Sequence, residues 1–129
     1  MKKLFLSFTL IAISFIANCQ NVDKVQAMIT GHKMNDTIKI ADFLKLSEIS
    51  LNNKEYSIVS FRQSFKDGNL YESHDSNSNK ITDEMKNGLS KMKNKDPEIM
   101  KIYIENINVQ KSKGKAINIS PLIFNIETK

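Results

Sequence analysis

Apolar and polar side chains alternate along residues 56–66, which is the clearest pattern in the chain. One side of this extended segment is apolar and carries Val59, Phe61 and Phe65. The other side is polar and carries Arg62, Ser64 and Lys66. Alternation of period two predicts a half-buried strand of an antiparallel sheet. Asp67-Gly68-Asn69 supplies turn residues, so residues 70–72 are expected to return as the partner strand, followed by an exposed Ser- and Asn-rich loop over 73–80.

A second pattern, with spacings of three and four, predicts a helix after Thr82. Thr82 is a suitable N-cap, and the two acidic residues that follow it suit the positive end of the helix dipole. The apolar stripe of this helix consists of Met85, Leu89 and Met92. Gly88 weakens the helix by about 1 kcal/mol relative to Ala, so docking on the sheet is needed to hold it. Asp96-Pro97 is expected to end it.

The last third of the chain predicts a long hairpin. Met100, Ile102 and Ile104 alternate with polar residues, and residues 111–115, centred on Gly114, are expected to form the tip. In the returning segment, residues 116–127, the apolar positions change from odd to even numbers at Ser120-Pro121. A bulge or a switch between sheets at Pro121 would explain this change of phase.

The N-terminal third of the domain gives weaker patterns. Residues 25–30 form an apolar stretch that stops at Gly31 and predicts an opening strand. Residues 38–46 begin as an extended segment and predict a short helix from about Ala41. Taken together, the patterns predict a mainly β fold, a small antiparallel β-sandwich with one or two short helices.

The first residues have the composition of a secretory signal peptide. Lys2 and Lys3 precede an uncharged stretch whose apolar part ends near Ala17, too short for a confident membrane span. We therefore expect residues 1–19 to be a signal peptide, residues 20–24 a short lead-in and residues 25–129 one domain. The chain has 129 residues, so removal of the first 19 leaves 110, a usual size for one domain.

Cys19 is the only cysteine, so no disulfide can form within the chain. Two outcomes of processing remain open at this residue. In one, Cys19 becomes the lipid-modified first residue of a bacterial lipoprotein, although Asn18 fits the preceding position poorly. In the other, an ordinary cleavage after Cys19 leaves Gln20 as the new N-terminus. The protein is expected in the periplasm or cell envelope in both cases, lipid-anchored in the first.

Charge and side-chain inventory disfavour nucleic-acid binding and catalysis. Loss of Lys2 and Lys3 lowers the formal net charge from +5 to +3, without the clustered basic stripe of a nucleic-acid binder. His32 and His74 are the only histidines, and His74-Asp75 is a weak acid–base or metal pair compared with a solvated loop. The sequence contains neither a nucleophile elbow nor a phosphate loop. We expect no enzyme activity, no metal and no cofactor.

Several short motifs occur in an order that resembles a known family. These are Val59-Ser60-Phe61, residues 81–86 (Ile-Thr-Asp-Glu-Met-Lys), residues 103–107 (Tyr-Ile-Glu-Asn-Ile) and the closing residues 121–124 (Pro-Leu-Ile-Phe). Over residues 25–127 the chain resembles the C-terminal domain of the gliding-motility protein GldM and its secretion counterpart PorM. The resemblance implies an immunoglobulin-like β-sandwich that acts in protein binding at the outer, periplasmic end of a long dimeric protein of the type IX secretion system.

The family's full-length protein also has an inner-membrane helix and further periplasmic domains, which have no counterpart in these motifs. The resemblance therefore implies the contacting end of that machine without the part that transmits force. The expected partners are envelope proteins, among them secretion or gliding components, and a homodimer is compatible with the resemblance. The alternative is a small-ligand or glycan-binding envelope domain unrelated to secretion, for which the absence of Trp and the presence of three Tyr leave few platform residues.

Four residues are candidates for contact with a partner. Glu105 and Asn106 lie inside the best-matching motif, although an open-face carboxylate and a strand-ending amide are the simpler interpretation. Tyr103 is an outward aromatic that suits an anchor, while cross-strand packing is its commoner role. Lys113 belongs to the Lys-rich tip, which suits an acidic protein or a lipid headgroup but is also typical of a solvated turn.

Overall fold

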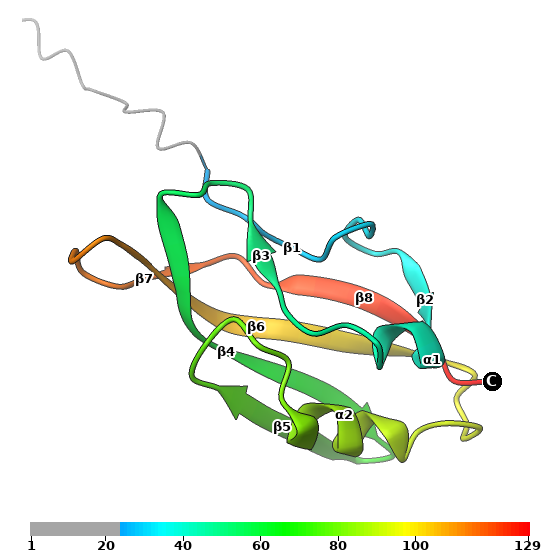
Figure 1. Ribbon diagram of the computed structural model, residues 1–129. Coiled ribbons are helices and arrows are strands. Elements are labelled where there is room, and N and C mark those ends of the chain that lie inside the picture. The colour runs from blue at the N-terminus through cyan, green and yellow to red at the C-terminus, as the bar shows by residue number, and fades with distance from the viewer. Residues whose placement is uncertain (1–23) are drawn as a thin grey trace, which may run out of the picture.

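The computed structural model describes residues 24–129, which form a mainly β fold with two helices (Figure 1). The expected signal peptide and Cys19 lie outside the described residues. The strands, in chain order, are β1 Ala27–Met28, β2 Thr37–Lys39, β3 Ser50–Leu51, β4 Tyr56–Asp67, β5 Leu70–Ser76, β6 Ile99–Lys111, β7 Ile117–Ile119 and β8 Leu122–Glu127. The helices are α1 Ile40–Phe43 and α2 Asp83–Ser90.

Most of the strands belong to one six-stranded sheet. Its order is β2-β8-β6-β4-β5, and β7 pairs with β6 beyond the end of β8. All of these pairs are antiparallel except β2 with β8, which is parallel. β1 and β3 form a separate two-stranded antiparallel sheet. The long central hairpin of β6 with β7 and β8 confirms the strand pairing that the C-terminal pattern predicts.

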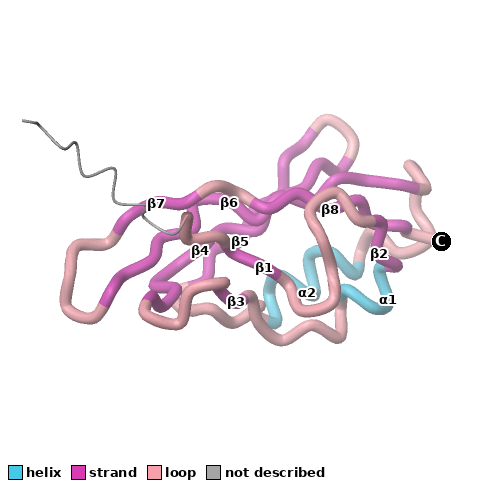
Figure 2. Tube along the Cα trace, turned by 90° about the horizontal axis from the view of Figure 1, so that it is seen from above, coloured by secondary structure: helices cyan, strands magenta, loops and turns pink. Residues whose placement is uncertain are grey.

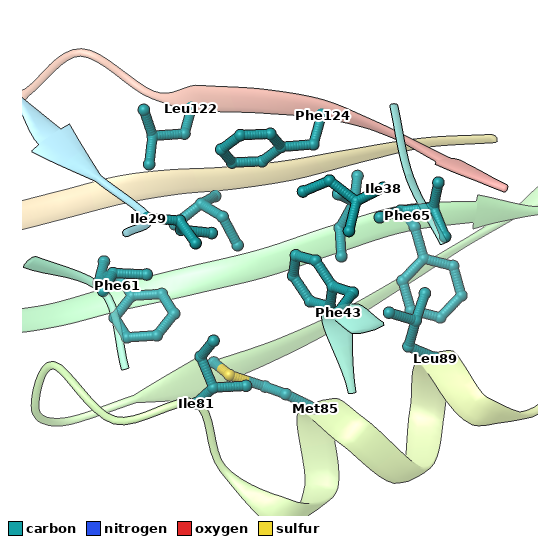
Figure 3. Packing of buried hydrophobic residues seen from close by; sticks show 14 of the residues in the cluster. Ile29, Ile38, Phe43, Phe61, Phe65, Ile81, Met85, Leu89, Leu122 and Phe124 are labelled. Atoms are coloured by element: carbon teal, nitrogen blue, oxygen red, sulfur yellow. The ribbon is translucent and has the colours of Figure 1, made fainter. Parts of the chain in front are cut away.

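The two helices and the β1–β3 sheet lie on one side of the six-stranded sheet, and the core fills the space between these layers (Figure 2). Phe61 and Phe65 of β4, Phe124 of β8, Phe43 of α1 and Leu89 of α2 all project into the space between the layers (Figure 3). All five side chains are almost fully buried. The opposite side of the sheet has no covering layer among the described residues, which leaves it open to solvent.

The predicted helix α2 begins where its sequence predicts. The Thr82 hydroxyl accepts a hydrogen bond from the backbone N–H of Met85, and Met85, Leu89 and Met92 are all buried. The amide of Gln63 on β4 donates to the carbonyl of Met85 at 3.1 Å and ties the helix to the sheet. The helix ends at Ser90, earlier than the Asp96-Pro97 boundary expected from the sequence, because turns occupy residues 91–94.

Two of the long strands are bulged, which corrects the simple alternation read from the sequence. In β4 the register with β6 shifts on both sides of Ser60, so Ile58 packs on the core and Val59 is 39% exposed. The prediction that Val59 shares the buried face of Phe61 and Phe65 is therefore wrong. A bulge adds one residue to one strand and thereby reverses the faces of the residues beyond it.

The change of phase near Pro121 has a matching feature in β6. The buried positions of β6 pass from Ile104 to Ile107 across Asn106, whose φ of 50° is in the left-handed region. Opposite this point, residues 120–121 separate β7 from β8, and both strands pair with β6. An interruption within one sheet, rather than a switch between sheets, therefore explains the pattern. β6 continues to Lys111, so Asn106 does not end its strand as expected.

The segment after the Asp67-Gly68-Asn69 turn is also longer than predicted. β5 extends through Ser76 and pairs with β4 in seven consecutive residues. The expectation that residues 73–80 form an exposed loop is wrong for 73–76. Small polar residues have low strand propensity, but the fully formed ladder with β4 overrides that preference.

Candidate functional site

The open face of the six-stranded sheet carries the polar side chains that alternate with the core residues. Strands β4, β5 and β6 contribute three sets to its central part: Arg62 and Ser64, then Tyr71, Ser73 and Asp75, then Tyr103 and Glu105. Since side chains of a strand point alternately to opposite faces, burial of Phe61, Gln63 and Phe65 places their neighbours outward.

Strand register arranges these side chains in two rows across the sheet. In the first row Arg62 lies between Asp75 on β5 and Glu105 on β6. In the second row Ser64 lies between Ser73 and Tyr103. We call the six residues Arg62, Ser64, Tyr71, Ser73, Tyr103 and Glu105 the open-face hollow.

The open-face hollow has a volume of about 410 Å³. Ser64 and Ser73 are short and form its floor, because they lie in adjacent strands between larger neighbours. Tyr71 and Tyr103 come from the two outer strands of the group, and Tyr71 is 72% exposed. Its lining therefore combines the apolar area of two phenol rings with hydroxyl groups that can form hydrogen bonds.

An ion pair holds the charged row in place. Arg62 Nε donates to Asp75 Oδ1 at 2.7 Å, and Arg62 donates from a terminal nitrogen to Asp75 Oδ2 at 3.1 Å. This fork-like geometry is the strong form of an arginine–carboxylate pair. The hydrogen bond from Arg62 lowers the pKa of Asp75 below its ordinary value, and the same contact raises the pKa of Arg62. Both groups remain charged at neutral pH.

Glu105, on the other side of Arg62 from Asp75, is held by a hydrogen bond from Ser64. The hydroxyl of Ser64 donates to Glu105 Oε1 at 2.5 Å. Glu105 also acts on Arg62 through its charge, although more weakly than Asp75 does. The row Asp75–Arg62–Glu105 thus carries two negative charges and one positive charge.

The structure brings two of the four candidate contact residues together. Tyr103 and Glu105 both line the open-face hollow, and Glu105 lies on the open face as expected. Asn106 lies at the bulge and, with Asn108, lines a smaller hollow that shares Arg62 with the open-face hollow. Lys113 is exposed at the tip of the β6–β7 hairpin, away from both.

Sequence reasoning missed four of the six members of the site, Arg62, Ser64, Tyr71 and Ser73. The sequence places Tyr71 in the returning strand, but its partners across the sheet depend on register. The alternation Tyr71-Ser73-Asp75, which continues the β5 pattern beyond Glu72, is the signal for the two residues of β5. The assumed loop at residue 73 concealed this signal. Arg62 and Ser64 were expected on the polar side of β4, but only the register shows what lies beside them.

The two histidines lie in separate places and neither joins this site. His74 Nε2 is 2.9 Å from Glu72 Oε1 on the face toward α2, whereas Asp75 points to the open face and pairs with Arg62. His32 lines a hollow between β1 and β8. Within residues 24–129 we find no group of three or more His, Cys, Asp or Glu placed to bind a metal ion.

Two further findings come from the described residues and from comparison. No helix in the part of the chain from Lys24 onward has both the length and the apolar character to cross a membrane. A scan against models of known protein families finds no match to this chain, and a search of the curated proteins finds no relative. The resemblance to the GldM family therefore remains an expectation from the motifs.

Proposed function

We propose that this protein is an exported, non-enzymatic module that binds another protein of the bacterial cell envelope, as the C-terminal domain of GldM does. In this proposal the six-stranded sheet and the layer over it are a variant of the immunoglobulin-like β-sandwich. The mainly β fold is compatible with it, as is the resemblance of the ordered motifs. Delivery depends on the signal peptide, with Cys19 as the point of lipid attachment if it is acylated.

The observation that carries the proposal is the open-face hollow. Interfaces are anchored by aromatic residues and arginine, and Tyr71, Tyr103 and Arg62 lie together on a face that the described residues leave uncovered. The Arg62–Asp75 and Ser64–Glu105 hydrogen bonds hold the polar groups in one geometry before any partner arrives. Such pre-organisation lowers the entropy lost on binding.

Site-specific photo-cross-linking in the native host tests this proposal. A photoreactive phenylalanine analogue replaces Tyr71, and a matched variant carries it at Glu84, which is exposed on α2. We expect cross-links from position 71 to an envelope protein, identified by mass spectrometry, and their loss when Tyr103→Ala is added. Equal cross-linking from position 84 would contradict an open-face contact. A third variant carries the analogue at Lys113. Cross-links from that position and none from position 71 would place the contact at the hairpin tip.

One observation favours the alternative of a small ligand. Two of the three tyrosines of the chain line the same hollow, which partly supplies the aromatic platform that such a site needs. Titration of the purified protein with a panel of neutral and acidic monosaccharides and disaccharides, followed by amide chemical shifts, tests it. Saturable shifts confined to residues around Ser64 and Ser73 would favour a ligand site over a protein contact.

A further inference from the structure

β5 differs from the other edge strands of the six-stranded sheet. β2 and β7 also lie at edges, but each has three residues, and β7 is followed by Pro121. Such features protect edges from pairing with another chain. β5 has seven residues, pairs with β4 without a bulge, and contains neither Lys nor Pro. It is therefore a long, regular edge strand without Lys, Pro or a bulge, and its two acidic residues, Glu72 and Asp75, are already paired within the same chain with His74 and Arg62.

The turn before β5 determines which backbone groups point outward. Asp67 and Leu70 are opposite each other across the two-residue turn Gly68-Asn69, and residues flanking such a turn exchange backbone hydrogen bonds. Because the direction of the backbone groups alternates along a strand, the N–H and C=O groups of the even-numbered residues of β5 point toward β4. Tyr71, Ser73 and Asp75 direct their N–H and C=O groups away from the sheet, where no described strand meets them.

We propose that β5 pairs antiparallel with β5 of a second copy of this chain, around a two-fold axis at Ser73. Residues 70 and 76 bound the strand, so an axis at its midpoint pairs all seven residues. Ser73 then faces Ser73 of the other copy, and Tyr71 faces Asp75. Glu72 faces His74 in both halves of the interface. These two side chains already meet within each copy, at 2.9 Å, so this register sets no like charges opposite each other.

Shifting the two-fold axis by one residue in either direction sets identical side chains of Glu72 or His74 opposite each other. The axis at Ser73 avoids this, so the side chains of β5 suit a second copy in one register. Moving the axis to Glu72 places two carboxylates directly opposite each other, and like charges in that position are destabilising. Moving it to His74 places two imidazoles opposite each other. Both moves also leave strand residues unpaired. The order of side chains along β5 therefore favours self-pairing in one register, as a two-fold interface requires.

Pairing at this edge would also enlarge the open face. Continuation of the sheet into a second copy sets the two open-face hollows on one continuous surface, with Tyr71 of each copy beside the junction and opposite the other copy's Asp75. The inference does not depend on what the hollow binds. It concerns the purified protein alone, so its failure would leave the proposed contact with an envelope protein standing.

The test combines sedimentation with amide hydrogen exchange resolved to single residues. The whole protein, as its host processes it, is purified and studied over a wide concentration range. We expect a reversible dimer and protection of the Tyr71, Ser73 and Asp75 amides that grows with concentration. The amides of Glu72 and His74 are expected to be protected at every concentration, because they bond to β4.

Ser73→Pro removes the outward N–H without touching the ladder to β4, a position at which an edge strand tolerates proline. We expect it to raise the dimer dissociation constant about tenfold or more, while Ser73→Thr, which keeps the N–H, changes it little. Circular dichroism checks that both variants fold. A monomer at all concentrations would overturn the inference. A dimer that survives Ser73→Pro with unprotected odd-numbered amides would overturn it as well.

Discussion

Arg62 and Asp75 show how single residues prepare the open face. Their fork-like pair lies at the surface, with side chains 42% and 62% exposed, so its effect on stability is small and screened by salt. Its larger effect is on orientation, since Arg62 is held between two carboxylates instead of extending into solvent. The pair therefore matters more for the shape of the hollow than for the free energy of unfolding.

We predict that Arg62→Gln raises the pKa of Asp75 toward its ordinary value, because the hydrogen bond that lowers it is lost. A lowered carboxyl pKa stabilises the folded state above the unfolded value, near 3.8, and this contribution disappears as pH falls through the folded pKa. The difference in the free energy of unfolding between wild type and variant should therefore be present at neutral pH and vanish once the pH falls below the folded-state pKa of Asp75. Carbon-13 NMR titration measures the pKa, and an unchanged value would contradict the pairing.

Gly88 has a role that helix propensity does not reveal. A Cβ at this position would lie 2.5 Å from Glu72 Oε1 and 2.7 Å from His74 Nε2. The missing side chain therefore lets α2 approach β5 closely enough to cover the Glu72–His74 pair. The glycine that weakens the isolated helix therefore leaves room for these two side chains between α2 and β5.

We predict that Gly88→Ala fails to give the stabilisation of about 1 kcal/mol that this change gives in an exposed helix. The gain in propensity is offset by displacement of Glu72 and His74. Asn87→Ala, one residue earlier and exposed, is the control and should stabilise by about 0.5 kcal/mol. Urea unfolding measures both variants. A full gain in Gly88→Ala would mean that the contact with β5 is loose.

At the scale of elements, the bulge in β6 sets which residues face the core. Asn106 adopts φ of 50°, a conformation that Asn tolerates better than other non-glycine residues. Beyond it, Ile107 and Val109 return to the buried face, and the strand can pair with β7 after pairing with β8. One residue in the left-handed region thus allows β6 to serve two partner strands along one edge.

We predict that Asn106→Val lowers the free energy of unfolding by about 1–2 kcal/mol, because a β-branched residue is strained at positive φ. Asn106→Gly should leave it nearly unchanged or raise it slightly. Lys101→Val, at an exposed position of the same strand, is the control and should stay within about 0.5 kcal/mol of wild type. Equal effects of the two Val variants in chemical unfolding would argue against strain at Asn106.

At the scale of the whole molecule, the two faces of the six-stranded sheet differ in burial. One face packs against α1, α2 and the β1–β3 sheet and supplies the core. The other carries the polar and aromatic side chains of the open-face hollow, which, apart from Ser64, remain at least partly exposed. Substitutions on the open face should therefore alter binding without loss of the fold.

We predict that Phe65→Ala, at a residue with no exposed surface, lowers the free energy of unfolding by about 3–5 kcal/mol. Tyr103→Ala, on the opposite face, should change it by less than about 1 kcal/mol. Guanidinium unfolding of both variants measures the difference. A large loss in Tyr103→Ala would mean that the tyrosine serves cross-strand packing, and the role of anchor would then be withdrawn.

Much of the local structure follows from the sequence because its causes are local. The Thr82 cap, the Met85–Leu89–Met92 stripe and the Gly68-Asn69 turn depend on residues within a few positions of each other. The alternating pattern of β6 up to Ile104 has the same origin. For these elements the expectation and the structure agree.

Tertiary structure alone decided the features that join distant segments. The bulges near Ser60 and Asn106, the length of β5 and the parallel placement of β2 beside β8 depend on which strands pair and in what register. The open-face hollow also depends on strand pairing and register. Tyr71 and Tyr103 are 32 positions apart in the chain and share a site through two antiparallel ladders to β4. Local patterns predict faces, but only register sets which side chains meet on them.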